Sequence, residues 1–331
     1  MIDSVYLCPI TRQPLTKQGN TLVSEAGTVY ELLSCALGSD IPVFISSDQL
    51  IGGDVISRAM YAKNDAEESY DNFLSWLFAT FDQDEEAFRL SLIKRLGIKP
   101  GDKVLVTGCG LGDDLKFLYP LLGEKGELYA QDLSDLMVAA ASRRMAERFP
   151  DSKNLHFSVS NASALPFPDG YFDATYHFGG INLFSDIATA IAEMARVTKE
   201  GGRVLVGDEG VAPWLKGKEF GKIAICNNAL WACEAPLNFI PECSRDVNLS
   251  WVLGNCFYVV DFTVARQLPF MNIDLVHKGT RGGSMRTRYF GQLEGVDPEL
   301  KEQVKKASSA AGKSVSQWVD EALRSQLEPK R

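Results

Sequence analysis

The sequence has few of the features that mark membrane and secreted proteins. No apolar run reaches the roughly 18 residues that a membrane-spanning helix needs. The first 30 residues also hold no basic segment followed by an apolar one, which is the pattern of a signal peptide. We therefore expect a cytoplasmic protein without a membrane span.

Cysteine and histidine are scarce and are not grouped. The chain has 7 cysteines and 3 histidines in 331 residues, and no two cysteines are spaced as Cys-x-x-Cys. An odd number of scattered cysteines argues against a disulfide framework and against a zinc ribbon. The sequence predicts buried or free thiols and no metal site.

The chain also lacks an excess of positive charge. Its net charge is −9, and this charge is uneven, because residues 271–331 carry +3 and residues 1–270 carry −12. A nucleic-acid-binding protein usually presents a strongly basic surface. The charge alone therefore disfavours nucleic acid as a partner.

Between about residues 100 and 208 the apolar pattern alternates between strands and helices. Strands are predicted at 102–108, 126–134, 154–160, 172–178 and 202–209, with helices between them that include a strongly amphipathic one over 134–149. Alternation of this kind is typical of parallel βαβ units. We predict an α/β, doubly wound (Rossmann-like) and mostly parallel sheet.

Three further segments surround these units. Residues 1–55, with short strands and many turn residues, predict a small β-rich module. Two β-type runs around Gly254 and Asn255 predict a hairpin that completes a seven-stranded sheet in a domain over 65–270, and the aromatic-rich segment 210–245 is predicted to be its substrate lid. Residues 280–328 predict a strand and two helices, with helix starts at Asp297 and Ser314.

The most informative stretch is VLVTGCGLGDD at 104–114. Gly108, Gly110 and Gly112 follow the first parallel strand, where α/β sheets bind nucleotides. The spacing is GxGxG instead of the GxGxxG of pyrophosphate-binding loops. Asp132 ends the second strand, from which a carboxylate can accept both ribose hydroxyls. A nucleoside ligand without phosphates, S-adenosylmethionine (SAM), fits these residues.

Four stretches in this order resemble the motifs of the class I SAM-dependent methyltransferases: VLVTGCGLG, YAQDLS, NASALPFPDGYFDATYHFGGINLFSD and ARVTKEGGRVLV. The stretch FGGIN, with Tyr70 and Asp71 upstream, is most similar to the ubiquinone/menaquinone C-methyltransferase group. The resemblance covers residues 65–210.

The resemblance implies which residues bind the cofactor SAM. The backbone of Gly108, Gly110 and Leu111 is expected at the methionine end, and Asp132 at the ribose. The remaining expected contacts are Asn161 and Ala162 at the adenine edge and His177 beside the cofactor.

Two positions depart from the family pattern. Val106 stands where members usually carry a carboxylate that helps to hold the ammonium group of SAM, so this group needs another partner. Asn161 stands where an aspartate is common, but its amide oxygen can still accept a hydrogen bond.

The predicted function is an enzyme, a SAM-dependent methyltransferase that transfers a methyl group to a small, apolar or aromatic acceptor by C- or O-methylation. A general base is needed only when the acceptor must lose a proton. His177 is the candidate base, and Tyr70 and Asn182 are expected to orient the acceptor.

The two ends of the chain leave alternatives open. YLCPITRQPL with DIPVFI resembles zinc-ribbon-like methyltransferase activators, but it keeps one cysteine of their set. The C-terminal segment resembles ribbon-helix-helix proteins, and a strand over MRTRYF would place Arg286 and Arg288 on one face. We favour homodimer formation or docking over DNA binding for this segment. The alternative function is a SAM-binding regulatory or non-methylating protein.

Overall fold

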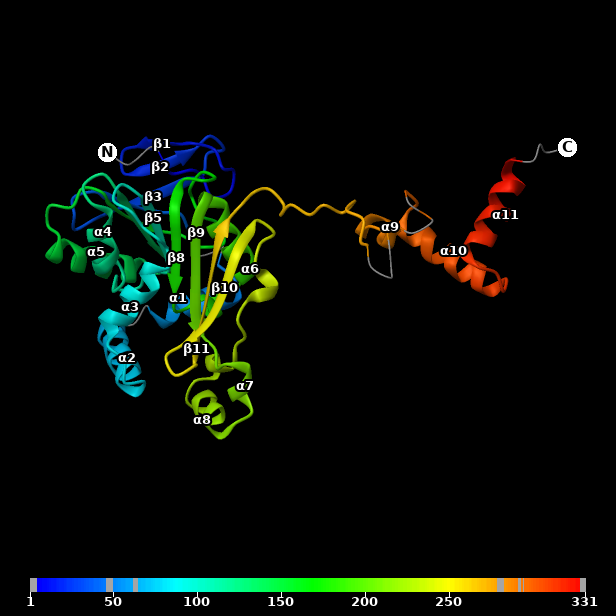
Figure 1. The fold of residues 1–331 in the computed structure, drawn as a ribbon. Helices are drawn as coiled ribbons and strands as arrows, with labels where there is room; N and C mark the ends of the chain where they lie inside the picture. The colour runs from blue at the N-terminus through cyan, green and yellow to red at the C-terminus, as the bar shows by residue number, and fades with distance from the viewer. Residues whose placement is uncertain are drawn as a thin grey trace. The chain divides into compact units, whose positions relative to one another are not determined.

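The computed structural model describes residues 5–45, 50–61, 65–278, 283–290, 293 and 295–327, without the side chains of residues 60 and 290. The chain forms two compact units, Met1–Leu268 and Pro269–Arg331, which are considered separately. Figure 1 shows the course of the chain through both units.

The first unit is built on one mixed sheet of eleven strands in the order β1-β2-β3-β4-β7-β6-β5-β8-β9-β11-β10. Their bounds are β1 (Leu15–Gln18), β2 (Thr21–Ser24), β3 (Val29–Ser34), β4 (Asp40–Val43), β5 (Lys103–Thr107), β6 (Glu127–Asp132), β7 (Leu155–Val159), β8 (Phe172–Phe178), β9 (Thr198–Glu209), β10 (Ser244–Val252) and β11 (Phe257–Val264). The five strands from β7 to β9 are parallel, as the alternating pattern predicts.

The helices of this unit precede the sheet's central strands or connect them. They are α1 (Gly52–Met60), α2 (Ala66–Thr80), α3 (Glu85–Lys94), α4 (Leu115–Leu122), α5 (Asp135–Arg148), α6 (Ile187–Val197), α7 (Pro213–Lys216) and α8 (Glu219–Asn227). Short 3-10 turns lie at η2 (Ile181–Leu183), η3 (Ala229–Ala232) and η4 (Leu237–Phe239). The predicted amphipathic helix is α5, which begins at Ser134, whose side chain accepts a hydrogen bond from the Met137 N–H.

The sheet has eleven strands and not the seven predicted. The seven strands from β7 to β10 in the sheet order correspond to the predicted sheet and come from residues 103–264. The other four strands extend it, because β4 pairs in parallel with β7 through Val43 and Val159. The Phe44 N–H donates to the Val159 carbonyl at 2.7 Å. The N-terminal strands therefore continue the central sheet. Local sequence patterns do not reveal this pairing, because it joins segments more than 100 residues apart.

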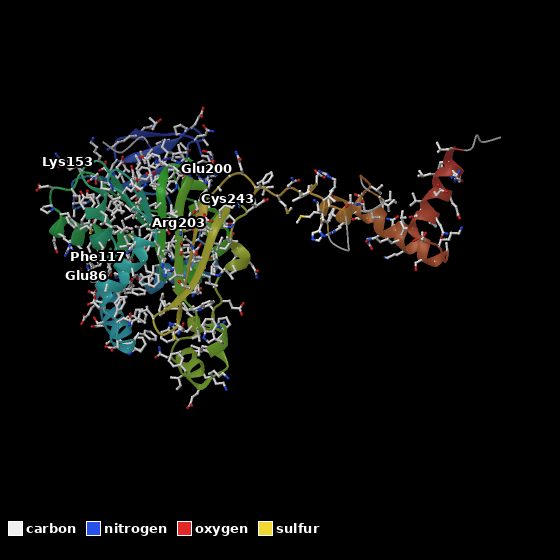
Figure 2. All side chains as sticks on the ribbon, in the orientation of Figure 1. Glu86, Phe117, Lys153, Glu200, Arg203 and Cys243 are labelled. Carbon is white, nitrogen blue, oxygen red and sulfur yellow. The ribbon has the colours of Figure 1, made fainter. Side chains whose placement is uncertain are left out.

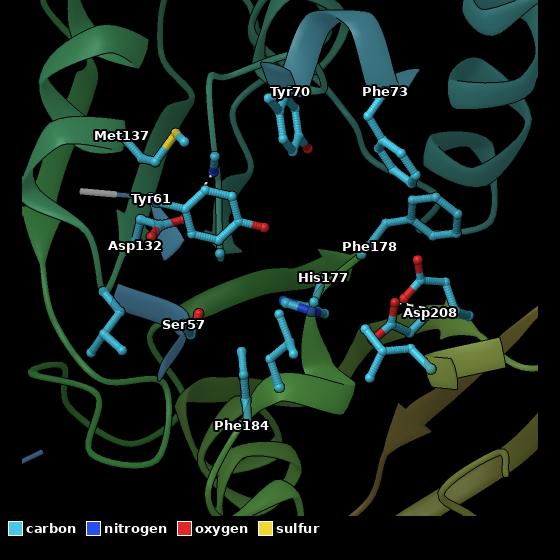
Figure 3. Close-up of a pocket in the computed structure, with 18 of the residues that line it drawn as sticks. Ser57, Tyr61, Tyr70, Phe73, Asp132, Met137, His177, Phe178, Phe184 and Asp208 are labelled. Atoms are coloured by element: carbon cyan, nitrogen blue, oxygen red, sulfur yellow. Dashed lines mark hydrogen bonds between the residues drawn. The ribbon is translucent and has the colours of Figure 1, made fainter. Parts of the chain in front are cut away.

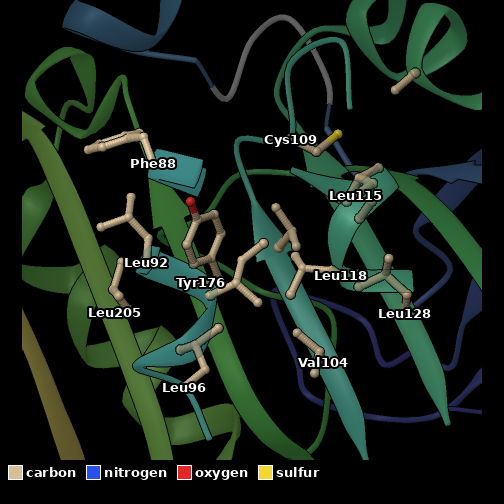
Figure 4. Packing of buried hydrophobic residues seen from close by; sticks show 14 of the residues in the cluster. Phe88, Leu92, Leu96, Val104, Cys109, Leu115, Leu118, Leu128, Tyr176 and Leu205 are labelled. Carbon is tan, nitrogen blue, oxygen red and sulfur yellow. The ribbon is translucent and has the colours of Figure 1, made fainter. Parts of the chain in front are cut away.

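Alternating side chains of β5 fill two separate cores. Val104 and Val106 face a large core together with side chains of α3, α4 and α5, including Leu92 and Leu118 (Figure 4). Leu105 faces the opposite side, among residues of the N-terminal module. Because successive strand residues point to opposite faces, a continuous apolar run such as VLV is what a strand covered on both faces requires.

The antiparallel end of the sheet is formed by the predicted hairpin. Gly254 and Asn255 have φ of 64° and 62° in its turn, where glycine and asparagine are the residues that adopt positive φ most readily. Arg203 of β9, labelled in Figure 2, forms an ion pair with Asp261 of β11 and donates to Thr263 at 2.9 Å. The hairpin is thus joined to the parallel strands by side chains as well as by the ladder.

The second unit contains three helices, α9 (Met285–Phe290), α10 (Pro298–Ala310) and α11 (Val315–Leu327). Asp297 caps α10, and Ser314 and Gln317 exchange capping hydrogen bonds at the start of α11, as predicted. The predicted strand over MRTRYF is wrong, because these residues form α9. The Ser284 N–H donates to the Thr287 hydroxyl, and the Thr287 N–H donates to the Ser284 hydroxyl. These local hydrogen bonds favour the start of a helix at this point.

No helix within the described ranges has both the length and the apolar character that crossing a bilayer requires.

A buried ion pair joins α3 to the start of α4. The Arg89 guanidinium, 4% exposed, lies 2.9 Å from Asp114 and 2.7 Å from Glu85. Burial would lower the pKa of Arg89, but the neighbouring Asp114 raises it above its ordinary value. Because both ends of the Arg89–Asp114 pair are shielded from water, their interaction is screened little by salt.

Replacing Arg89 with methionine should leave Asp114 as a nearly buried, uncompensated charge. We expect the free energy of unfolding to fall by about 3–5 kcal/mol, measured by urea denaturation. The control is Arg143→Met, which removes an exposed pair with Glu67 and should cost less than about 1 kcal/mol. Equal losses in the two variants would contradict the assignment of Arg89 as a structural cation.

Candidate functional site

A cavity of about 520 Å³ lies at the carboxyl ends of the parallel strands. Residues following or ending β5, β6, β7, β8 and β9 line it, and residues of α1 and α2, together with Tyr61 and Asp65, close it from the other side (Figure 3). A volume of this size lies within the range of about 300–1,000 Å³ that is typical of small-molecule sites. The site predicted from the glycine-rich stretch therefore coincides with a real cavity.

The turn after β5 exposes bare main chain to this cavity. Gly108, Gly110 and Gly112 have φ of 60°, 51° and 88°, which side-chain-bearing residues rarely adopt. A Cβ atom at Gly108 would lie 2.8 Å from the His177 ring, and one at Gly110 would lie 3.4 Å from the Tyr70 hydroxyl. The backbone conformation therefore favours glycine at all three positions, and at Gly108 the close approach of His177 excludes a side chain as well.

Asp132 holds the glycine turn to the end of β6. Its Oδ2 accepts a hydrogen bond from the Gly110 N–H at 2.9 Å, and its Oδ1 accepts one from the Ser134 N–H at 2.9 Å. Burial raises the pKa of Asp132 above its usual value, while these N–H donors act in the opposite direction. Each carboxylate oxygen can accept more than one hydrogen bond, so both keep capacity for a ligand's hydroxyl groups.

Asn161 and Ala162 also line the cavity, beyond the end of β7. The Asn161 amide donates to Asp54 at 3.0 Å, and its oxygen accepts from the Ser163 N–H at 2.8 Å. Asp54 of α1 is buried and also accepts a hydrogen bond from the Ser185 N–H. Asp54 lies outside the motifs recognised in the sequence, yet its hydrogen bonds fix α1 across the cavity.

His177 of β8 lines the cavity with an unpartnered nitrogen. The residue is 0% exposed, and its Nδ1 donates to the Thr107 carbonyl oxygen at 2.8 Å. Nε2 therefore carries a lone pair, and it is buried without a hydrogen-bond partner. Burial lowers the pKa of His177 to about 4, so the imidazole is neutral at physiological pH.

Two tyrosines close the cavity opposite the sheet. Tyr70 of α2 and Tyr61 after α1 lie with ring centres 6.5 Å apart, and both line the cavity (Figure 3). Burial raises the pKa of both hydroxyls, that of Tyr61 to about 12. Both groups are therefore neutral donors at physiological pH.

Two residues singled out from the sequence do not line the cavity. Leu111 is 1% exposed and packs against Met137 of α5. The Asn182 side chain donates to the Glu209 carbonyl at 2.8 Å and accepts from the Tyr258 hydroxyl at 3.0 Å. All of these hydrogen bonds are internal, so the structure uses the Asn182 amide to hold the ends of β9 and β11.

Two carboxylates at the end of β9 line the cavity and were not predicted as site residues. Asp208 accepts hydrogen bonds from the N–H groups of Asn182 at 2.7 Å and Glu209 at 2.8 Å. Burial raises the pKa of Asp208 to about 6, and burial together with the Asp208 charge raises that of Glu209 to about 8. Their position in the sequence could have indicated this role, because Asp208 and Glu209, like Asp132, end a predicted parallel strand.

Val106 is 2% exposed and packs in the core. Its side chain thus leaves the turn without the carboxylate that the family pattern usually provides there.

Comparisons with known proteins agree with this geometry. Residues 104–202 match the family model described as a methyltransferase domain. The chain is 34% identical over 114 residues to a ubiquinone/menaquinone biosynthesis C-methyltransferase UbiE of Francisella philomiragia, covering 34% of this chain and 45% of the relative. The corresponding protein of Burkholderia mallei is 33% identical over 120 residues, covering 36% and 48%. The chain thus spans about half the length of the curated relatives that it matches.

The fold is similar to that of a solved structure, phosphoethanolamine N-methyltransferase 2 of Haemonchus contortus in complex with S-adenosyl-L-methionine. The TM-score is 0.52 at 13% identity, covering 76% of this chain and 71% of the other. At this identity the likeness concerns the fold. The family model and the curated relatives, together with the glycine turn and Asp132, support the assignment of residues 104–202 to a methyltransferase domain of the class I SAM-dependent type.

Proposed function

We propose that the protein is a SAM-dependent methyltransferase that acts on a small, apolar or aromatic acceptor. The observation that carries the proposal is the pairing of a bare glycine turn with the Asp132 carboxylate inside one cavity. The match of residues 104–202 to a methyltransferase domain supports it.

The residues of the cavity fit SAM in three respects. Gly108 and Gly110 line the cavity with main chain that carries no side chain, and Asp132 keeps acceptor capacity for the ribose hydroxyls. Asn161 and Ala162 lie further along the same cavity, where the adenine edge is proposed to bind. Leu111 contributes to this arrangement through its backbone and its packing against α5.

When bound, SAM supplies a methyl group on a positively charged sulfur, which is already an activated leaving group. The task left to the protein is to hold the acceptor in line with that methyl group and to exclude water. Tyr70 can donate a hydrogen bond from its neutral hydroxyl, and the apolar cavity walls can hold an aromatic ring. Asn182 acts indirectly, by fixing the strand ends on which the acceptor side is built.

His177 is better suited to accepting a hydrogen bond than to removing a proton. A base with a pKa of about 4 is too weak to take a proton efficiently from a phenol or an enol near neutral pH. Its unpartnered Nε2 instead offers a lone pair to a donor on the ligand. We therefore propose a binding role for His177 in place of the predicted role as base.

The alternative of a DNA-binding regulator has less support. It depended on a strand over MRTRYF that would present Arg286 and Arg288 to DNA, and these residues form α9. Arg286 also forms an ion pair with Asp274 at 2.6 Å within the same unit. Homodimer formation through the C-terminal unit and a cytoplasmic location stay predictions.

Replacing Asp132 with asparagine should weaken SAM binding by about ten- to hundred-fold, because it removes a charged acceptor of the ribose hydroxyls. Isothermal titration calorimetry with SAM measures the effect. The control is Asp151→Asn at an exposed position, which should bind SAM like the wild type. Unchanged affinity in the Asp132 variant would refute the proposed ribose site.

His177 should remain neutral, with its proton on Nδ1, down to about pH 4. Since unfolded histidine has a pKa near 6.5, the unfolded chain takes up this proton first, and the free energy of unfolding should fall between about pH 6.5 and pH 4. Nitrogen-detected NMR of the imidazole, assigned with His177→Gln, measures the titration. A midpoint near 6.5 would show that the ring is not buried as described.

A further inference from the structure

The half of the cavity around the end of β9 is acidic, and no described residue forms an ion pair with its carboxylates. Asp208 is 0% and Glu209 8% exposed, and both line the cavity. Among the described residues, no lysine or arginine lies within ion-pair distance of either carboxylate. Arg89, which also lines the cavity, is already paired with Asp114.

The two carboxylates differ in how they are held. Asp208 accepts hydrogen bonds from backbone N–H groups on both oxygens, which favours its charged form and fixes its position. Glu209 is held by side chains alone: it accepts a hydrogen bond from the Asn228 amide at 3.1 Å, and the Trp231 indole N–H acts on the same carboxylate in the direction that lowers its pKa. Asp208 is therefore a fixed charge, and Glu209 is the member of the pair that can exchange a proton with a ligand.

A second observation indicates that a ligand binds in this part of the cavity. His177 reaches the cavity from β8, the strand paired with β9, and its buried Nε2 has no partner. Figure 3 shows His177 between Asp132 on one side of the hollow and Asp208 on the other. The Asp132 side is proposed to hold the nucleoside, which leaves the Asp208 side for the acceptor.

Aromatic rings form the walls beside the acidic pair. Phe178 of β8 and Phe257 of β11 both line the cavity and stack with ring centres 6.0 Å apart. An aromatic or conjugated ligand can lie against these rings while a polar group at its edge reaches Glu209. The combination of apolar walls and one buried proton acceptor is selective for a flat molecule with a hydroxyl group.

On the basis of the proposed function, we propose that Glu209 is the general base of the reaction and that the acceptor is a phenol or an enol whose hydroxyl proton Glu209 removes. The acceptor O–H bond breaks and its proton passes to a Glu209 oxygen. The electron pair left on the acceptor, on oxygen or on the conjugated carbon, bonds to the methyl carbon. When a ring carbon of a phenol attacks, the product is a dienone, and the proton of that carbon then moves to the oxygen and restores the aromatic ring. The carbon–sulfur bond breaks with its pair on sulfur, so the sulfonium becomes a neutral thioether, and Glu209 later releases its proton to water.

The groups that face the pair from neighbouring elements do not change this assignment. Tyr61 after α1, Tyr258 of β11 and Cys233 after η3 all have a raised pKa, in each case chiefly because of burial. They are therefore neutral where Glu209 titrates. Lys216 approaches Glu234 at 3.8 Å, on the exposed side of this segment.

The test uses binding to the full chain saturated with S-adenosylhomocysteine. The probes are 4-ethylphenol, its methyl ether 4-ethylanisole, and 4-ethylbenzylamine, measured by ligand-observed NMR at pH 8.5. We expect the wild type to bind the phenol at least tenfold more tightly than the ether and more tightly than the amine. We expect Glu209→Gln to reduce the preference over the ether to less than threefold, and Glu242→Gln, at an exposed position, to keep it.

The pH dependence of the affinity for 4-ethylphenol distinguishes a titrating carboxylate from a polar group that does not titrate. Wild-type affinity for 4-ethylphenol should rise as the pH passes through about 8, where Glu209 ionises. In Asp208→Asn this rise should move to lower pH, because the charge that raises the pKa of Glu209 is removed. Infrared difference spectra of the wild type at pH 9 should show a shift of a carboxylate stretching band on binding the phenol, because its hydroxyl donates to Glu209, and no such shift on binding the ether.

Three results would overturn the proposal: equal affinity for phenol and ether in the wild type, an unchanged preference in Glu209→Gln, or tighter binding of the amine. If Glu209→Gln does not fold, the infrared measurement on the wild type decides. Repeating the probe titrations without S-adenosylhomocysteine, beside the SAM titration of the wild type, distinguishes the two proposals. A wild type that fails to bind SAM refutes the proposed function, whereas a wild type that binds SAM but does not prefer the phenol refutes the role of Glu209.

Discussion

The hydrogen bonds from Gly110 and Ser134 to the Asp132 carboxylate are the constraint on which the site depends. They join the loop after β5 to the loop after β6, so two turns that carry no regular structure are held at a fixed separation. A charged acceptor is suited to this task, because hydrogen bonds to charged groups are stronger than those between neutral groups. The same carboxylate that shapes the turn is the group that we propose binds the ribose, so a change at Asp132 would alter the loop and the proposed binding together.

The cavity divides into two ends with different electrostatic character. At one end the Asp132 charge is stabilised by backbone N–H groups that belong to the glycine turn and to the start of α5. At the other end Asp208 and Glu209 share a buried space, so that ionising both is unfavourable. His177 lies between the two ends, and because its imidazole is neutral near pH 7 it does not offset the negative charge of either end.

Much of the central fold follows from local sequence patterns. Short apolar runs and amphipathic helices predict the five parallel strands, α5 and the hairpin around Gly254, since each of these is encoded within about 20 residues. The glycine turn and Asp132 are predictable for the same reason, because their roles depend on spacing along one βαβ unit.

The remainder depends on contacts between distant segments. Asp54 is fixed through Asn161 and Ser185, more than 100 residues away, so nothing near Asp54 in the sequence indicates its role. Asn182 looked like a site residue by its position after β8, but the backbone of β9 and the hydroxyl of Tyr258 use its amide. The stretch MRTRYF alternates as a strand would, yet the local bonds between Ser284 and Thr287 favour a helix.

The parallel pairing of β4 with β7 has a consequence for how this protein stays separate from its neighbours. The outermost strand of a parallel array offers a row of free amide and carbonyl groups, which invites a foreign chain to add itself by the same hydrogen bonds. Here β4 pairs with the free edge of β7, and β3, β2 and β1 follow it in the sheet. The sheet therefore ends on this side at β1, a strand of four residues, and so short an edge offers few free backbone groups to a foreign chain.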